Sequence, residues 1–163
     1  MLTRGVLALT LAGLLLAGGC SGPSYEEGLT AYQKGDYTRA AEIWRGLAQE
    51  GHTRAQQQLA NLYRGGMGVD RDFAESARWA ERAARQGHAP AQFNLAHLLD
   101  KGMGVERDAA AAYKWYRRAA VSLPSKPRRT EAREHAERLA GELSPGKRQQ
   151  LQEELRNWTA QPE

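Results

Sequence analysis

The residues of this chain that could do chemistry are four histidines, one cysteine and the carboxylates. His52 and His88 lie 36 residues apart. A zinc site would need three or four ligands with nitrogens about 2.0–2.1 Å from the metal. Neither His97 nor His135 supplies a ligand at a suitable spacing, and the motifs G-x-S-x-G and H-E-x-x-H are absent from the sequence. We therefore expect no metal, no cofactor and no catalytic residue.

Two glycine-rich segments, residues 66–68 and 102–104, could suggest a phosphate-binding loop. Neither follows a strand pattern, and neither continues into the Gly-Lys-Ser/Thr of a P-loop. Both recur at the same interval as the histidines. We expect them to be positive-φ turns between helices, a conformation that glycine adopts readily.

The N-terminus has the pattern of an export signal. Arg4 precedes an apolar run at 6–17, which is shorter than the about 20 residues of a membrane span and matches a signal-peptide core of about 7–15 residues. The run Leu-Ala-Gly-Gly-Cys that ends at Cys20 resembles the bacterial lipobox, although Ala17 stands where Leu is usual. The resemblance implies a signal peptide at 1–19 and an acylated tether at 20–24.

Lipidation of Cys20 implies a bacterial outer-membrane lipoprotein that faces the periplasm and is held to the membrane by its acyl chains. The alternative is an ordinary cleaved signal followed by a stray thiol. A single cysteine also excludes an internal disulfide and a cysteine-based zinc finger.

Composition bounds the fold of the whole chain of 163 residues. The chain is 41% hydrophobic and 26% charged, its mean hydropathy is −0.68 and its formal net charge is +4. Strand-forming residues are sparse, and Ala, Leu, Arg, Glu and Gln dominate, which favours helix. These values argue against disorder, an all-β fold and a polytopic membrane protein.

An internal repeat is the main signal. When the chain is shifted by 36, residues 51–86 align with 87–122 and 18 of the 36 pairs are identical. A degenerate third copy occupies about 25–50. Each copy predicts two helices: Leu59 and Leu62 share one face of the first, and Asp72, like Asp36 and Asp108, is placed to cap the second.

The repeat resembles the Sel-one-like repeat family, which is related to the tetratricopeptide repeats. The residues that carry the resemblance are the Ala-x-x-x-Leu-Ala-x-Leu run, the Gly-Met-Gly-Val loop, the Asp cap and the Trp followed by Ala-Ala. The resemblance implies an all-α, short right-handed α-solenoid of helix-turn-helix hairpins over 25–122, acting as a protein–protein interaction scaffold without shared catalytic residues.

The C-terminal segment departs from the repeat. Residues 123–129 contain two prolines and predict a stiff connector. Thr130 is placed to cap a helix over 131–143, and Ser144-Pro145 begins another helix. We expect 130–163 to form a helical hairpin that caps the solenoid; the alternative is a docking helix for a partner.

The resemblance also implies a binding face on the exposed side of each first helix. Phe93 would be an aromatic anchor there, or would be buried against the neighbouring hairpin. The partner would be an envelope protein or peptide. The implied positions are Arg54, Gln57, Asn61, Arg64, Phe93, His97 and Lys101, extended by Glu26, Thr30 and Gln33.

A local basic cluster supports an alternative function. It would bind an anionic envelope glycan or lipopolysaccharide, or weakly hydrolyse the glycan. The simpler interpretation of these cations is a solvated surface. Export makes nucleic acid an improbable partner. The cluster comprises Arg117, Arg118, Lys126, Arg128 and Arg129, with Arg133 nearby.

Overall fold

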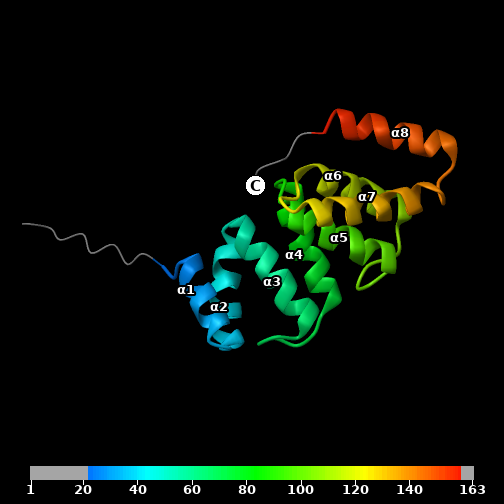
Figure 1. The fold of residues 1–163 in the computed structure, drawn as a ribbon. Helices are drawn as coiled ribbons and strands as arrows, with labels where there is room; N and C mark the ends of the chain where they lie inside the picture. The colour runs from blue at the N-terminus through cyan, green and yellow to red at the C-terminus, as the bar shows by residue number, and fades with distance from the viewer. Residues whose placement is uncertain (1–21, 159–163) are drawn as a thin grey trace, which may run out of the picture.

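The computed structural model describes residues 22–158, which form eight α-helices and no strand. From α1 to α7, successive helices pack as antiparallel neighbours, so the hairpins follow one another along the chain, and α8 lies on α6 (Figure 1). The expected all-α solenoid is confirmed. The helices are α1 (Tyr25–Gln33), α2 (Tyr37–Gln49), α3 (Thr53–Gly65), α4 (Phe73–Arg85), α5 (Ala89–Lys101), α6 (Ala109–Ser122), α7 (Lys126–Ala140) and α8 (Pro145–Arg156).

Helix starts follow the capping residues of the sequence. The side chains of Asp36, Asp72 and Asp108 accept backbone N–H bonds at the starts of α2, α4 and α6. Ser24 and Ser144 do the same for α1 and α8. An oxygen at this position satisfies one of the backbone donors that a helix leaves unpaired.

The glycine loops fix the distance between successive hairpins. Gly68 and Gly104 have φ values of +68° and +71°. A Cβ atom at Gly68 would lie 2.2 Å from the carbonyl carbon of Tyr37, and one at Gly104 would lie 2.2 Å from that of Phe73. Each loop therefore lies directly on the first residue of the preceding hairpin's second helix. Their predicted role as positive-φ turns is confirmed.

Small residues bring the helices close together. Trp44 and Trp79 are buried, together with ten alanines of the second helices: Ala40, Ala41 and Ala48 of α2, Ala77, Ala80, Ala83 and Ala84 of α4, and Ala112, Ala119 and Ala120 of α6. The indole of Trp44 covers Gly28, where an added Cβ would lie 2.4 Å from Nε1. Trp115, the equivalent residue of α6, is only half-buried.

The C-terminal expectation was wrong in detail. Lys126 and Pro127 form the first turn of α7, so the connector is shorter than 123–129 and the helix does not begin at Glu131. Proline fits there because the first helical N–H groups have no partner within the helix. The helix closes the stack by burying Ala132, Ala136, Leu139 and Ala140.

The helix α8 packs chiefly on α6 rather than as a hairpin partner of α7. Leu151 is buried in the same cluster as α6 and α7. Lys114 of α6 donates to Glu154 of α8 at 2.9 Å. Residues 159–163, the end of the expected hairpin, lie outside the described residues.

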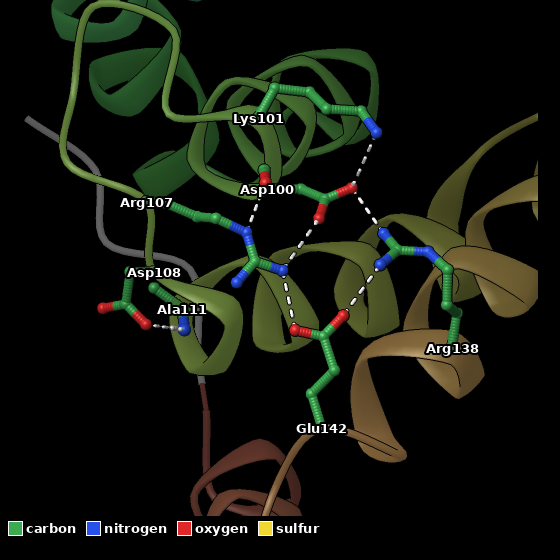
Figure 2. A network of polar contacts seen from close by, with 7 residues as sticks. All are labelled: Asp100, Lys101, Arg107, Asp108, Ala111, Arg138 and Glu142. Atoms are coloured by element: carbon green, nitrogen blue, oxygen red, sulfur yellow. Dashed lines mark hydrogen bonds and ion pairs between the residues drawn. The ribbon is translucent and has the colours of Figure 1, made fainter.

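A polar network holds α7 in place. Asp100 of α5 is buried and its carboxylate receives the guanidinium of Arg138 from α7. Arg107 donates to the backbone oxygen of Asp100 at 2.9 Å and to Glu142 at 2.7 Å. Glu142 also pairs with Arg138, which completes a ring of alternating charges (Figure 2). The network ties α5, the loop after it and the end of α7 together.

Candidate functional site

A groove of about 440 Å³ runs along the first helices of the hairpins. Every residue that lines it belongs to α1, α3, α5 or α7, or to the N-cap of α5. This is the side on which the family resemblance placed the binding face. The lining residues are Tyr25, Arg54, Gln57, Gln58, Asn61, Arg64, His88, Pro90, Asn94 and Arg128.

The groove is cationic. It is lined by Arg54, Arg64 and Arg128 and by no carboxylate of residues 22–158. None of the three forms an ion pair within that range. The guanidinium of Arg54 lies 4.3 Å from the ring centre of Tyr25, and that of Arg128 lies 4.7 Å from that of Phe93. Aromatic rings thus hold two cations at the groove wall.

A chain of side-chain amides crosses the floor of the groove. Asn94 of α5 donates to Asn61 of α3 at 3.1 Å, and Asn61 donates to Gln58 at 3.3 Å. Gln58 in turn donates to the hydroxyl of Tyr25 in α1 at 3.1 Å. Three first helices are therefore joined by groups that can both donate and accept hydrogen bonds.

Two buried polar atoms of the groove have no hydrogen-bond partner among residues 22–158. Gln57 Oε1 is one, and the side chain of Gln57 is only 5% exposed. His88 Nδ1 is the other. Burial, and then the charge of Arg54, lowers the pKa of His88, so its ring is neutral at neutral pH. Unpaired buried polar atoms are costly, and a ligand that bonded them would recover that cost.

A second cavity of about 260 Å³ adjoins the groove and shares Arg64, Asn94 and Arg128 with it. Phe93 and His97 line it, together with Glu131 and His135 from α7. Burial, and then the charge of Lys101, lowers the pKa of His97.

Phe93 is a buried side chain rather than an exposed anchor. It is 8% exposed and contacts the ring of Tyr116 edge-on at 5.3 Å. Gln57, at the equivalent position of α3, is also buried, which corrects its expected exposure. Lys101 is exposed, lines neither cavity and lies 3.9 Å from Asp100.

Sequence reasoning missed several lining residues. Gln58 and Asn94 are equivalent positions of two repeats, one residue beyond the expected pair Gln57 and Phe93. A polar residue at both positions was the signal that could have found them. Tyr25, His88 and Pro90 were also missed. His52 and His88 both stand at helix N-caps. His52 Nδ1 accepts a hydrogen bond from the backbone N–H of Ala55 at 3.1 Å.

The basic cluster of the alternative function does not gather in one place. Arg128 lines the groove, whereas Arg117 and Arg118 line a different cavity. Arg117 pairs with Glu137 at 3.1 Å, and Arg129 donates to the carbonyl oxygen of Leu123 at 2.7 Å. Lys126 is exposed at the start of α7.

No group of three or more His, Cys, Asp or Glu side chains within residues 22–158 is placed to hold a metal ion. Within the same residues, every helix is too short or too polar to cross a membrane. Cys20 and the predicted signal peptide lie outside the described residues.

Comparison with known proteins identifies the repeat. The model of the Sel1 repeat matches residues 53–88 and 89–120, which are α3/α4 and most of α5/α6. The chain contains two Sel1 repeats. The period of 36 residues agrees with the repeat found by aligning the chain with itself, the boundaries lie within two residues of 51–86 and 87–122, and the family resemblance is confirmed. No curated protein matches the sequence.

Two solved structures share the Sel1-repeat fold. One is c5321, a protective antigen of uropathogenic Escherichia coli with an SLR fold: identity is 28%, the TM-score is 0.70 and 80% of this chain is covered. The other is a Sel1 repeat protein from Oxalobacter formigenes: identity is 29%, the TM-score is 0.64 and 73% is covered. The chain spans only 28% and 47% of the lengths of these proteins.

Proteins built from Sel1 repeats generally mediate protein–protein interactions, and the repeat is generally a non-catalytic scaffold. The partner therefore has to be inferred from the groove itself.

Proposed function

We propose that this chain is a non-catalytic adaptor of the bacterial cell envelope that binds an acidic segment of another envelope protein in its groove. The observation that carries the proposal is the charge of the groove: Arg54, Arg64 and Arg128 line it without a carboxylate. Carboxylates bind arginine through short, charge-assisted hydrogen bonds. An acidic side chain is therefore the complementary group.

The uncharged atoms of the groove favour a peptide over a small anion. Gln57 Oε1 can accept a backbone N–H, and the amides of Gln58, Asn61 and Asn94 can bond a peptide carbonyl. Along α3, the amides Gln57, Gln58 and Asn61 stand between Arg54 and Arg64. An extended segment could place its backbone on the amides and its acidic side chains on the arginines.

A lipid on Cys20 would place this groove near a membrane surface. The supporting observation is the lipobox-like run that ends at Cys20. Metabolic labelling with a tagged fatty acid, followed by membrane fractionation, tests this part. We expect label on the chain and recovery in the outer membrane, with both lost in Cys20→Ser. A labelled Cys20→Ser variant would contradict the anchor.

The groove is tested with a fluorescent pentaglutamate peptide and the full-length chain, by fluorescence anisotropy. We expect binding that weakens as salt is added, because exposed charges are screened beyond about 10 Å at 0.1 M salt. Arg64→Gln should weaken binding about tenfold, the loss expected for one charge-assisted bond.

The matched control is Arg39→Gln. Arg39 is an exposed arginine of α2, outside the groove, that pairs with Glu42 at 3.1 Å. It should leave binding unchanged. Pentaglutamine should not bind. Equal losses in the two variants would show diffuse attraction to a basic protein and would overturn the groove as the site.

A further inference from the structure

Equivalent glutamines of the two repeats have different surroundings. Gln56 of α3 and Gln92 of α5 are both buried. Each donates its Nε2 to a backbone oxygen of the preceding second helix: Gln56 to Ala48 and Gln92 to Ala84, both at 3.2 Å. The repeat thus positions the two amides in the same way.

Their acceptor atoms differ. Gln56 Oε1 receives Nε2 of Gln86, the C-cap of α4, at 2.9 Å. Gln86 also donates to the backbone oxygen of Gly51 at 3.2 Å and accepts from Thr53. It therefore acts as a polar plug that closes the first repeat.

The second repeat lacks this plug. Ser122 stands at the position of Gln86, and Ala89 stands at that of Thr53. Gln92 is 1% exposed, and its Oε1 has no hydrogen-bond partner in the part of the chain that the structure describes. A buried acceptor without a donor is costly, unless something outside the described residues supplies the donor.

A cavity of about 290 Å³ lies at this point, between α5, α6 and α8. Val121, Leu155 and Trp158 give it apolar walls, and Val121 is 80% exposed. The lining residues are Gln92, Arg117, Arg118, Val121, Ser122, Leu155 and Trp158. None of them lines the groove, so this cavity is a separate site.

Arg118 is the only cation of this cavity without a carboxylate partner among residues 22–158, since Arg117 pairs with Glu137. Its guanidinium lies 4.7 Å from the ring centre of Trp115 and 4.2 Å from that of Trp158. Its buried Nε has no hydrogen-bond partner.

Burial lowers the pKa of Arg118 to about 10, and the charge of Glu154 opposes this shift. Glu154 is itself bonded to Lys114 at 2.9 Å. Arg118 is thus a desolvated cation that lacks a counter-ion of its own.

We propose that this cavity binds the C-terminal residue of a partner peptide that ends in an apolar amino acid. The terminal carboxylate would pair with Arg118, and the backbone N–H of that residue would donate to Gln92 Oε1. Its side chain would lie against Val121, Leu155 and Trp158. A chain end combines an anion, an amide donor and an apolar group within one residue, which suits so small a cavity.

The test uses N-acetyl-leucine as the probe and the indole N–H signals of the full-length, ¹⁵N-labelled chain as the readout. The chain has four tryptophans. We expect the signals of Trp115 and Trp158 to shift and those of the buried Trp44 and Trp79 to stay. Binding should be weak and saturable, as for any ligand with so few atoms.

Two matched probes separate the contributions. N-acetyl-leucinamide lacks the carboxylate and should bind about tenfold more weakly, the cost of one charge-assisted bond. The acid 4-methylpentanoate keeps the carboxylate and the side chain but lacks the amide N–H. It should bind about fivefold more weakly, because Gln92 Oε1 stays unpaired.

Three variants locate the site. Ser122→Gln gives the second repeat the glutamine that plugs the first repeat. It should abolish binding while the chain stays folded. Arg118→Gln should weaken binding about tenfold. Arg39→Gln is the matched control, because this exposed arginine of α2 lies outside the cavity, and it should change affinity less than twofold.

Three results would overturn the proposal: no saturable shift at Trp158, equal binding of N-acetyl-leucine and its amide, or undiminished binding by the folded Ser122→Gln variant. If 4-methylpentanoate binds as tightly as N-acetyl-leucine, the ligand of the cavity is an apolar acid such as a fatty acid and not the end of a peptide chain. Because Ser122→Gln adds a plug rather than removing a contact, it remains informative even if Arg118→Gln does not fold.

Discussion

The hairpins α3/α4 and α5/α6 are identical at 18 of 36 equivalent positions, and these positions make the same local structure. Both second helices are capped by aspartate, and both loops hold a left-handed glycine at the first helix's C-cap. The hairpins differ where the sequence differs. Arg64 lines the groove, whereas Asp100, at the equivalent position, is buried in the network that holds α7.

The same contrast recurs at two further pairs. Gln86 plugs the first hairpin, and Ser122 leaves a cavity in the second. Trp79 is buried and donates to Glu75 at 3.1 Å, whereas Trp115 is half-buried beside Arg118. Shared residues thus specify the hairpin, and divergent residues adapt each copy to its own neighbours. Each repeat can therefore serve as the control for the other.

The largest effect should come from a shared position. Gly68→Ala and Gly104→Ala should each destabilise the fold by about 3 kcal/mol or more, because both require positive φ and would place Cβ against backbone atoms. Urea unfolding measures this. Gly46→Ala, in an open part of α2, should instead stabilise the fold by about 0.5–1 kcal/mol. A tolerated alanine at only one loop would show that the two hairpins are not equivalent there.

The second-largest effect should come from Asp100 and Arg64, which are equivalent positions at which the two repeats differ. Asp100→Ala should destabilise the fold by about 2 kcal/mol, because two arginines lose a buried charged acceptor. Hydrogen exchange should quicken first in α7. Arg64→Ala, at the equivalent position, should change stability by less than about 0.5 kcal/mol. Equal losses would contradict the division of roles between these positions.

The polar plug predicts a change of opposite sign in the two repeats. Gln86→Ser should cost about 2 kcal/mol, because it removes three side-chain hydrogen bonds and leaves Gln56 Oε1 without the donor of Gln86. Ser122→Gln should raise stability by about 1 kcal/mol, because Gln92 Oε1 gains a donor. Thermal unfolding of both variants checks the signs, and a destabilised Ser122→Gln would disprove the equivalence.

The smallest effect concerns the N-cap of α5. Burial lowers the pKa of His88, so the unfolded chain takes up a proton more readily as the pH falls below about 6.5. The free energy of unfolding therefore falls as the pH is lowered, and His88 contributes part of this fall. His88→Asn, which keeps a capping residue, should lose less stability between pH 7.5 and pH 5 than the parent chain. Parallel stability curves for the two proteins would contradict the expectation.

Sequence alone predicted the repeated hairpins well because their information is local. The leucine spacing, the aspartate caps and the glycine turns all lie within or next to the helix that they specify. They therefore set where each helix begins and ends without long-range contacts. The start of α7 was missed because Pro127 indicates a break, yet proline also fits the first turn of a helix. The network of Asp100 was missed because Arg138 lies 38 residues away.

The lining of the groove was predicted only in part, and its role as a binding face stays a prediction. Arg54, Gln57, Asn61 and Arg64 all line the groove, because one helix face is set by the period of the helix. Whether the neighbouring row of side chains is exposed depends on contacts with other helices. Phe93 packs against Tyr116 of α6 and His135 of α7, and so the open position of α5 is Asn94.

The most direct measurement is site-specific photocrosslinking in living cells, with the crosslinker at Asn94 in the groove and, as the control, at the exposed Glu42 of α2. We expect one envelope protein to be attached from position 94 through an acidic segment, and no such adduct from position 42. The adduct should disappear when Arg54→Gln and Arg64→Gln are added. The same adduct from both positions, or its persistence without those arginines, would contradict the groove as the binding site.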